Sequence, residues 1–436
     1  DLAQGEEIPD RIIKKIFDPT ITKAAYNAQF EITCLSKHFG RKVDPGQWRC
    51  TMVLGAQAGY PFGLDAIAKT LKIIEQKDAT GKALIKYFCM PCKPTKVNGG
   101  RTRNLPIHDL EKWNNFKGYN VQDVVVERAV DESLAWFTIS EFEMDMWHLD
   151  QKINSTGVKI DLQLVTNAVA IDVQNTIDLK EEMKQLTGII NPKSVAQIKK
   201  FILDQTGTTV PALNKETISI VKEMFKDNPV VRKVIDIKEN LSFTSITKYK
   251  AIQNSYCKDQ TVKGLFQYYG ASRTGRWSGR NVQLQNLKRN DLDDLDLARQ
   301  AVKQNSIDSI RLCWDNTSRV LSNLVRTAFI PSDGHKLVVS DFSAIEARIV
   351  AWFSQEQWRL NVFKTHGKIY EASASMMFKI PMDQITKELR TKGKVAELAL
   401  GYQGALGALQ RMGGEKMGLT DEDMLSLVRK WRQANR

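Results

Sequence analysis

The sequence predicts an α+β protein of several domains. Its 436 residues are enough for two to four domains with sizeable cores. Residues 1–140 mix short apolar runs with helical patterns, which is typical of an α/β unit, whereas the pattern of 141–262 is mainly helical. The apolar run Leu337–Val339 stops near an acid and is followed by helical spacing, which predicts a strand joined to a helix.

The net charge indicates an anionic partner. Lys and Arg outnumber Asp and Glu by 63 to 50, which gives a formal charge of +13, although charge alone also allows a solvated basic surface. No apolar run approaches the roughly 20 residues that span a bilayer, so we expect a soluble, intracellular protein without a membrane partner. Six scattered cysteines form no disulfide framework. Cys89 and Cys92 form a CxxC without the second pair that zinc needs, so we expect a structural role for them.

Two helix-like segments in the first part carry acids. NAQFE, at Asn27–Glu31, enters an amphipathic helix with Glu31 on its first turn, and YNVQD, at Tyr119–Asp123, opens another. The spacing places the Tyr119 phenol and the Asp123 carboxylate on one face, an arrangement suited to orienting a water beside a metal. Taken alone, each segment is more simply explained as a helix start with favourable negative charge. Residues 93–106, between them, have the composition of a basic exposed loop.

The part that follows is predicted to be a helical arm. Asp161 can cap a helix that ends at Gly188, and Asn191 with Pro192 can start another that ends at Gly207. Lysines recur along this arm, at 193, 199, 200, 222, 226 and 233. They form either a solvated face or a surface that grips a phosphate backbone.

Residues 263–290 combine arginines, aromatic residues, glycines and amides. These are Arg273, Arg276, Arg280 and Arg289, with Tyr268, Tyr269, Trp277, Gln283, Gln285 and Asn286. Glycines let a backbone approach a ligand, arginines pair with phosphates, and amides can contact minor-groove acceptors. The mixture favours nucleic-acid contact over a simple basic hairpin loop. Residues 291–327 are acidic and amphipathic, and their sequence contains no motif that indicates a chemical function.

Asp341 stands at the junction of the predicted strand and helix. The carboxyl ends of strands are where open sheets present chemistry, and a buried acid is costly unless a cation, a metal or several donors satisfy it. An aspartate before a helix is equally a common N-cap. These residues alone leave metal ligand and cap as equal alternatives.

Arg390, Lys394, Leu398 and Tyr402 recur every four residues and therefore form one stripe on a helix. The stripe is about 18 Å long, with two cations at one end and an apolar and an aromatic residue at the other. A nucleoside triphosphate has the same polarity, with phosphates for the cations and sugar and base for the other end. An ordinary amphipathic helix is the alternative.

Three ordered motifs carry a family resemblance: TGRWS with LQN (274–278 and 284–286), SDFSAIEAR (340–348) and RTKGKVAELALGYQG (390–404). Together they resemble the family A DNA polymerases, most of all the bacteriophage branch. The resemblance implies a right-hand fold of palm, thumb and fingers, preceded by an RNase H-like 3′–5′ exonuclease domain with NAQFE and YNVQD as its second and third motifs. The implied parts are exonuclease-like at 1–140, start of palm and thumb at 141–262, palm at 263–350 and fingers at 351–436.

The resemblance also implies an activity and roles for single residues. Deoxynucleotides would be added to a primer 3′ end on a DNA template during replication, with two Mg²⁺ ions, or Mn²⁺, held by Asp341 and the Phe342 carbonyl. The implied catalytic residues are Asp341, Glu346, Arg390, Lys394 and Tyr402. The implied nucleotide-binding residues are Phe342, Glu346, Tyr370, Arg390, Lys394, Leu398 and Tyr402. The implied DNA-binding residues are Arg276, Gln285, Asn286 and Arg348, and those of the exonuclease are Asn27, Glu31, Tyr119 and Asp123.

Expected partners are primer-template DNA, deoxynucleoside triphosphates and a processivity factor, in the cytoplasm of a bacterial host. The chain departs from the family pattern at Glu31, where Asp is usual, at Leu398, where Phe or Tyr is usual, and at Tyr370, where His is common. The first exonuclease motif and the second palm carboxylate are expected outside residues 1–436, so we expect weak primer extension from this chain alone. The alternatives are a non-catalytic DNA-binding remnant and a 3′–5′ exonuclease with a DNA-holding region.

Overall fold

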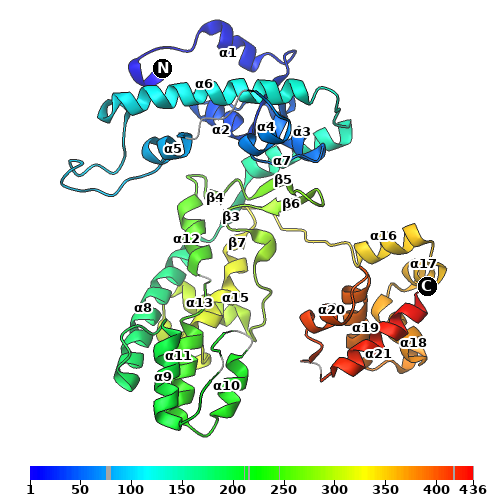
Figure 1. The fold of residues 1–436 in the computed structure, drawn as a ribbon. Helices are drawn as coiled ribbons and strands as arrows, with labels where there is room; N and C mark the ends of the chain where they lie inside the picture. The colour runs from blue at the N-terminus through cyan, green and yellow to red at the C-terminus, as the bar shows by residue number, and fades with distance from the viewer. Residues whose placement is uncertain (75–79, 211, 215–216, 245, 416–417, 436) are drawn as a thin grey trace. The chain divides into compact units, whose positions relative to one another are not determined.

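The computed structural model describes residues 1–436 except 75–79, 211, 215–216, 245, 416–417 and 436. The chain divides into two compact units, residues 1–337 and 338–436 (Figure 1). Helices dominate both units. No helix in the described residues is long and apolar enough to cross a membrane.

In the described part of the first 156 residues there are seven α-helices and a small parallel sheet. In the sheet β1 (Lys23–Ala25) pairs with β2 (Trp48–Cys50). The helices are α1 (Asp10–Phe17), α2 (Gln29–His38), α3 (Thr51–Gln57), α4 (Leu64–Thr70), α5 (Gly81–Cys89), α6 (Leu110–Ser133) and α7 (Glu141–Thr156). The long helix α6 lies along α3 and α4, where Leu54, Ile67 and Val130 share one apolar cluster (Figure 1).

The prediction for NAQFE is confirmed, but that for YNVQD is wrong. Helix α2 begins at Gln29 with Glu31 in its first turn. In contrast, Tyr119 and Asp123 lie inside α6, which begins at Leu110. The Asp109 side chain accepts a hydrogen bond from the Lys112 backbone N–H at 3.0 Å and so caps the helix ten residues before Tyr119.

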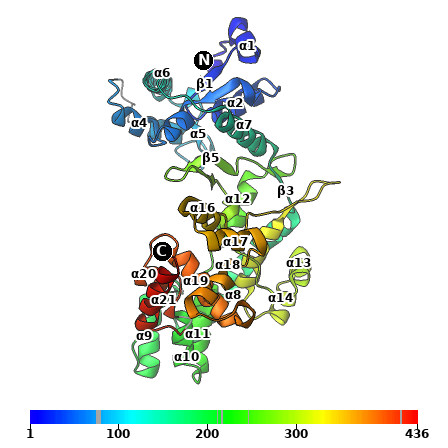
Figure 2. The ribbon, with the colours of Figure 1, turned by 90° about the vertical axis from the view of Figure 1, so that its right-hand side faces the viewer.

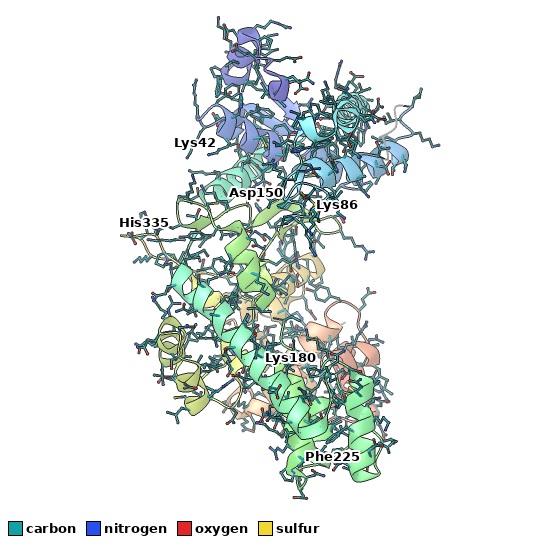
Figure 3. The ribbon with its side chains drawn as sticks, turned by 90° about the vertical axis from the view of Figure 1, so that its left-hand side faces the viewer. Lys42, Lys86, Asp150, Lys180, Phe225 and His335 are labelled. Carbon is teal, nitrogen blue, oxygen red and sulfur yellow. The ribbon has the colours of Figure 1, made fainter. Side chains whose placement is uncertain are left out.

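The helical arm begins as predicted. The Asp161 carboxylate accepts from the Leu164 backbone N–H at 3.1 Å and caps α8 (Leu162–Thr187), and Gly188 ends this helix in the left-handed conformation with φ 71°. Figure 3 labels Lys180 on α8. Helix α9 (Val195–Thr206) begins later than predicted, because Ser194 and not Asn191 caps it, but it ends at Gly207 as expected. The arm continues with α10 (Ile218–Met224), α11 (Pro229–Asn240) and α12 (Ile246–Ser255).

The lysines of the arm mostly face neighbouring acids. Lys200, Lys222, Lys226 and Lys233 form ion pairs, with Asp204, Asp236, Glu223 and Glu182 respectively. Most of these pairs are solvent-exposed, which agrees with the interpretation of a solvated face.

Residues 291–327, for which the sequence shows no chemistry, have a structural role. They form α13 (Leu295–Lys303), α14 (Ile307–Cys313), α15 (Thr317–Leu324) and part of the turn η5 (Val325–Ala328). Buried side chains of these elements, among them Val302, Ile310 and Leu321, pack on Leu164 and Ile171 of α8. A three-stranded antiparallel sheet, in the order β4 (Thr261–Val262), β3 (Val158–Ile160) and β7 (Phe329–Ile330), adjoins this core.

The described residues of the second unit form six α-helices. They are α16 (Ile345–Ser354), α17 (Gln357–Thr365), α18 (Ile369–Phe378), α19 (Lys387–Leu400), α20 (Leu406–Arg411) and α21 (Asp421–Ala434), with the turn η6 (Met382–Gln384). Helices α18, α19 and α21 lie side by side around a core that includes Val395, Leu400 and Leu427 (Figure 2). At Gly393 a Cβ would lie 2.2 Å from the Tyr370 carbonyl oxygen, so α18 and α19 approach closely only because this residue is glycine.

The predicted strand at Leu337–Val339 does not form. These three residues lie outside any strand or helix and are 56%, 82% and 89% exposed. A strand needs a neighbouring backbone to satisfy its N–H and C=O groups, and none of the described strands pairs with this segment. Asp341 is therefore an exposed loop residue and does not lie at the end of a buried strand.

Asp161 offers a test of the packing around α8. Its carboxylate caps the helix and also pairs with Arg299 and with Lys303, the latter at 3.2 Å. Asp161→Asn keeps an oxygen for the cap but loses the charge, and Asp161→Ala loses both. We expect urea unfolding to show a larger loss for Ala, about 3 kcal/mol, than for Asn.

The exposed Asp204 provides the control, because its pair with Lys200 lies in solvent and Asp204→Ala should cost less than about 0.5 kcal/mol. Equal losses for Asp161→Asn and Asp161→Ala would contradict a contribution of the cap.

Candidate functional site

Residues from five helices of the second unit, with the loop before α16 and the turn after α19, surround a cavity of about 280 Å³. Six residues that the sequence analysis selected line it: Asp341, Phe342, Glu346, Tyr370, Leu398 and Tyr402. They come from the loop before α16, from α16, from α18 and from α19 with the turn after it. The fold thus brings together side chains up to 61 positions apart, from 341 to 402.

The stripe on α19 is exposed, as predicted. Thr386 caps α19 by accepting from the Leu389 backbone N–H at 3.3 Å. Arg390, Lys394 and Leu398 then face solvent, while Val395, Ala396, Ala399 and Leu400 are buried in the core. Leu398 lines the cavity, and Arg390 and Lys394 continue the stripe along the helix outside the cavity lining. A ligand with an apolar end and an anionic end could therefore lie along this face.

Tyr402 lies just beyond the end of α19, and its hydroxyl donates a hydrogen bond to the Glu346 carboxylate. This bond joins two predicted site residues across the cavity. Arg390 is also engaged, because its Nε donates to Glu371 Oε1 at 2.8 Å. Arg348 donates from Nε to the Ser343 carbonyl oxygen at 2.8 Å and lies on the same helix as Glu346.

The sequence analysis missed a buried ion pair beside the cavity. Arg359 of α17 and Glu397 of α19 are only 5% and 6% exposed, and two hydrogen bonds of 2.7 and 2.8 Å join them. The Ser373 hydroxyl also donates to Glu397, and Arg359 Nε donates to the Asn435 side chain at 2.9 Å. Both charged residues line the cavity. The sequence signal that could have indicated this ion pair was Glu397 itself, a glutamate on the otherwise apolar face of α19.

The donor set around Asp341 allows a limited metal site. Carboxylate and carbonyl oxygens suit Mg²⁺, which proteins often hold through one or two carboxylates together with substrate phosphates. That Asp341 and the Phe342 carbonyl hold such an ion stays a prediction. Within the described part of the chain, no group of three or more His, Cys, Asp or Glu residues is arranged to hold a metal ion.

In the first unit, residues 263–290 form a basic hairpin. Strand β5 (Phe266–Ala271) pairs with β6 (Arg276–Gly279), and the turn η4 (Leu284–Asn286) follows. Arg276, Gln285 and Asn286 are exposed. At Gly279 a Cβ would lie 2.3 Å from the Gln285 side-chain oxygen, so the glycine allows Gln285 to lie against β6. The segment thus forms the basic hairpin that the sequence analysis gave as the alternative, and the favoured contact with nucleic acid stays a prediction.

Helix α7 anchors this hairpin through buried polar groups. Trp277 Nε1 donates to Asp150 Oδ1 at 2.8 Å, and the Asn154 side chain donates to the Phe266 carbonyl and accepts from its N–H at 3.0 and 2.9 Å. Figure 3 labels Asp150 on α7, beside the hairpin. Burial raises the pKa of Asp150 to about 6, against the hydrogen bonds from Trp277 and Asn154. The position of the exposed arginines thus depends on α7.

The exonuclease-like residues are spread over two environments. Asn27 lines a cavity of about 320 Å³ together with Asp150 and Arg280, and Glu31 is not part of that lining. Tyr119 is 7% exposed and packs in an apolar cluster with Leu84 and Phe88.

The charge of Glu31 acts on Glu127, an acid of α6 that the motif does not include. Burial raises the pKa of Glu31, and burial together with the nearby charge of Glu31 raises the pKa of Glu127 to about 7. Glu127 was not among the residues that the sequence analysis selected. A role for Asn27, Glu31, Tyr119 and Asp123 in hydrolysis stays a prediction.

The sequence also matches the model of a known protein family. Residues 166–415, more than half of the chain, match the model of DNA polymerase family A. The chain therefore belongs to DNA polymerase family A, a family of DNA-directed DNA polymerases whose members generally use divalent metal ions.

Individual proteins that are similar to this chain are also DNA polymerases. A DNA polymerase of Bacillus phage SP02 is 52% identical over the whole chain, which covers 67% of that protein. DNA polymerase I of Caldicellulosiruptor bescii is 22% identical over 63% of the chain, and thermostable DNA polymerase I of Thermus aquaticus is 24% identical over 62%. The chain spans about two thirds of the phage polymerase and 30% of each of these two bacterial ones.

A solved structure shows the same fold. It is the POL domain of Pol1 from M. smegmatis, in complex with DNA primer-template and dNTP, and it superposes with a TM-score of 0.61 at 16% identity. The superposition covers 99% of this chain and 67% of that one. The predicted α+β polymerase fold is thus confirmed, while the four-part division of the chain stays a prediction.

The Arg359–Glu397 pair yields a stability prediction. Arg359→Met leaves the Glu397 carboxylate buried without its cation, so we expect urea unfolding to show a loss of about 3–5 kcal/mol. The double variant Arg359→Met with Glu397→Leu removes both charges and should recover most of that loss. A double variant as unstable as the sum of the two single variants would contradict a coupled pair.

Glu127 yields a pH prediction. Its pKa is about 7 in the folded chain against an ordinary value of 4.5, so the folded state holds the proton more tightly and loses stability as the pH rises from 4.5 to 7. Glu127→Gln should therefore leave stability unchanged at pH 4. At pH 8 it should raise stability by about 1 kcal/mol, after allowance for partial solvent screening.

The exposed Glu132 of the same helix provides the control, because Glu132→Gln should change stability little at either pH. A loss of stability in Glu127→Gln at pH 8 would contradict the raised pKa.

Proposed function

We propose that this chain binds an incoming deoxynucleoside triphosphate and a primer-template, and that it serves template-directed addition of deoxynucleotides to a primer 3′ end. The observation that carries the proposal is the cavity in the second unit, together with the exposed cations that extend from it along α19. A cavity with an apolar wall and two adjacent cations matches the two ends of a nucleotide.

The nucleotide would lie along α19. Its triphosphate would meet Arg390 and Lys394, and its base and sugar would meet Leu398 and Tyr402. Glu346 would lie under the sugar, where a 2′ hydroxyl would clash, and its hydrogen bond with Tyr402 holds the carboxylate in that place. Leucine presents no aromatic face, so we expect the contact of Leu398 with the sugar to rest on its aliphatic surface alone.

Asp341 and the Phe342 carbonyl would hold Mg²⁺ against the triphosphate. When bound, the ion neutralises charge on the phosphates and polarises the phosphorus for attack by the primer hydroxyl, and a second ion would assist that hydroxyl. The exposed loop position of Asp341 leaves its carboxylate open to such an ion. Arg390 and Lys394 would add positive charge as pyrophosphate leaves.

The primer-template would contact the basic hairpin and α16. Arg276, Gln285 and Asn286 are exposed on or just after the hairpin, and Arg348 lies on α16. Minor-groove acceptors are similar for all correct base pairs, so these contacts would check shape without demanding a sequence. The formal charge of +13 supports a polyanionic partner. By resemblance to the phage polymerases, we place the activity in the cytoplasm of a bacterial host.

The alternatives place different demands on the chain. A non-catalytic DNA-binding remnant needs no triphosphate stripe, yet Arg390, Lys394 and Leu398 keep both their order and their exposure. An exonuclease would need its residues together at a metal, whereas Asn27 lines a cavity and Tyr119 packs in a separate apolar cluster. Both observations favour nucleotide transfer over the alternatives.

Primer extension tests the proposal, with each substitution made in the full-length polymerase that carries this chain, because weak extension is expected from residues 1–436 alone. With Mg²⁺ and a labelled primer-template, Asp341→Ala should reduce extension about a thousandfold, because it removes the carboxylate that holds the metal. Lys394→Ala should raise the KM for the deoxynucleotide about tenfold, because it removes a cation from the triphosphate.

Lys392 provides the matched control. It lies on the opposite face of α19, in an ion pair with Glu388, and Lys392→Ala should leave the KM unchanged. Calorimetric titration of Mg–dNTP into the same proteins separates binding from chemistry. A chain that binds DNA tightly but neither binds nor incorporates a deoxynucleotide would favour the remnant alternative.

A further inference from the structure

Two consecutive residues of α18 contact the guanidinium of Arg390. The Arg390 Nε donates to Glu371 Oε1 at 2.8 Å, and the Arg390 guanidinium carbon lies 5.5 Å from the centre of the Tyr370 ring. The Arg390 side chain is 46% exposed, whereas that of Glu371 is only 22% exposed. A half-exposed arginine normally samples many rotamers, so these two contacts restrict a side chain that would otherwise be free.

The close packing of α18 on α19 makes these contacts possible. Gly393 lies three residues after Arg390, and a Cβ there would be 2.2 Å from the Tyr370 carbonyl oxygen and 3.1 Å from the Ala374 Cβ. The two backbones therefore touch within one helical turn of Arg390. Tyr370 and Glu371 reach the guanidinium because of this approach.

The geometry of the pair leaves the arginine able to bind an anion. A guanidinium has five N–H donors, and the bond to Glu371 uses only the one on Nε. The two terminal nitrogens keep four N–H groups in a fork that matches phosphate oxygens. Lys394, one turn further along α19, is exposed on the same face.

Glu371 stays ionised at neutral pH. Burial alone would raise the pKa of its carboxyl, but the hydrogen bond and the charge of Arg390 act in the opposite direction, and the pKa lies below its ordinary value. The ion pair is therefore present under the conditions in which a nucleotide would bind.

We infer that Glu371 is a positioning residue, which holds Nε of Arg390 so that the terminal nitrogens of its guanidinium face the triphosphate before the nucleotide arrives. Tyr370 supports the same orientation from the face of the guanidinium plane. This inference rests on the proposed function, because it needs a triphosphate on α19. It assigns to α18 a share in nucleotide affinity through a residue that would not touch the nucleotide.

Two substitutions at Glu371 separate orientation from charge. Glu371→Gln keeps an oxygen that can accept from Nε but loses the charge, and Glu371→Ala loses both. In steady-state primer extension we expect Glu371→Ala to raise the KM for the deoxynucleotide about tenfold with kcat within about twofold of the parent. Glu371→Gln should leave the KM within about twofold of the parent or lower it, because the repulsion of the triphosphate is also removed.

Glu388 provides the matched control. It is a carboxylate on α19 that pairs with Lys392 at 2.8 Å on the face opposite Arg390, so Glu388→Ala removes the same charge without touching the arginine. Its KM should equal that of the parent. In an Arg390→Ala background, Glu371→Ala should cause no further rise in KM, because the side chain that Glu371 positions is already absent.

Several outcomes would overturn the inference. An unchanged or lowered KM in Glu371→Ala would show that the carboxylate does not orient the arginine or only competes with the nucleotide. A rise in KM that persists in the Arg390→Ala background, or that Glu388→Ala shares, would show a general effect on the fold or the charge. Calorimetric titration of Mg–dNTP separates the two proposals: a parent that binds no Mg–dNTP overturns both. A parent that binds it as tightly as Glu371→Ala overturns the positioning role alone.

Discussion

The rotation of α19 about its own axis controls the candidate site. Successive residues of a helix are 100° apart, so a rotation by one position would turn Arg390 and Lys394 away from the face that they share. The Arg359–Glu397 pair opposes such a rotation, because a buried carboxylate cannot leave its cation without a large desolvation cost. The close contact at Gly393 and the cap at Thr386 fix the same helix along its length.

Local patterns in the sequence were sufficient for part of this arrangement. The stripe on α19 follows from four-residue spacing, and the start and end of α8 follow from Asp161 and Gly188, because caps and helical faces depend on neighbours within a few positions. The resemblance to a family supplied Asp341, Glu346 and Tyr370, and the fold brings them to one cavity. Their roles in the reaction stay predictions.

Other features could not be predicted because they depend on distant parts of the chain. Arg359 and Glu397 are 38 positions apart, and no local sequence pattern near either residue identifies the other as its partner. The apolar run Leu337–Val339 has the composition of a strand, but a strand also requires a partner, and composition carries no information about partners. The start of α6 was missed because the one acid of YNVQD, Asp123, suits a helix start equally well, while the cap lies at Asp109.

The glycine at position 393 has a consequence for how this sequence can change over time. A glycine inside a helix costs about 1 kcal/mol relative to alanine, so helix propensity alone would favour its replacement by alanine. Here replacement is blocked by the backbone of another helix, at Tyr370 and Ala374. A larger residue at 393 would need α18 to move outward, which would take Glu371 away from Arg390. Positions 370, 371, 374, 390 and 393 should therefore vary together among relatives, as one inherited set.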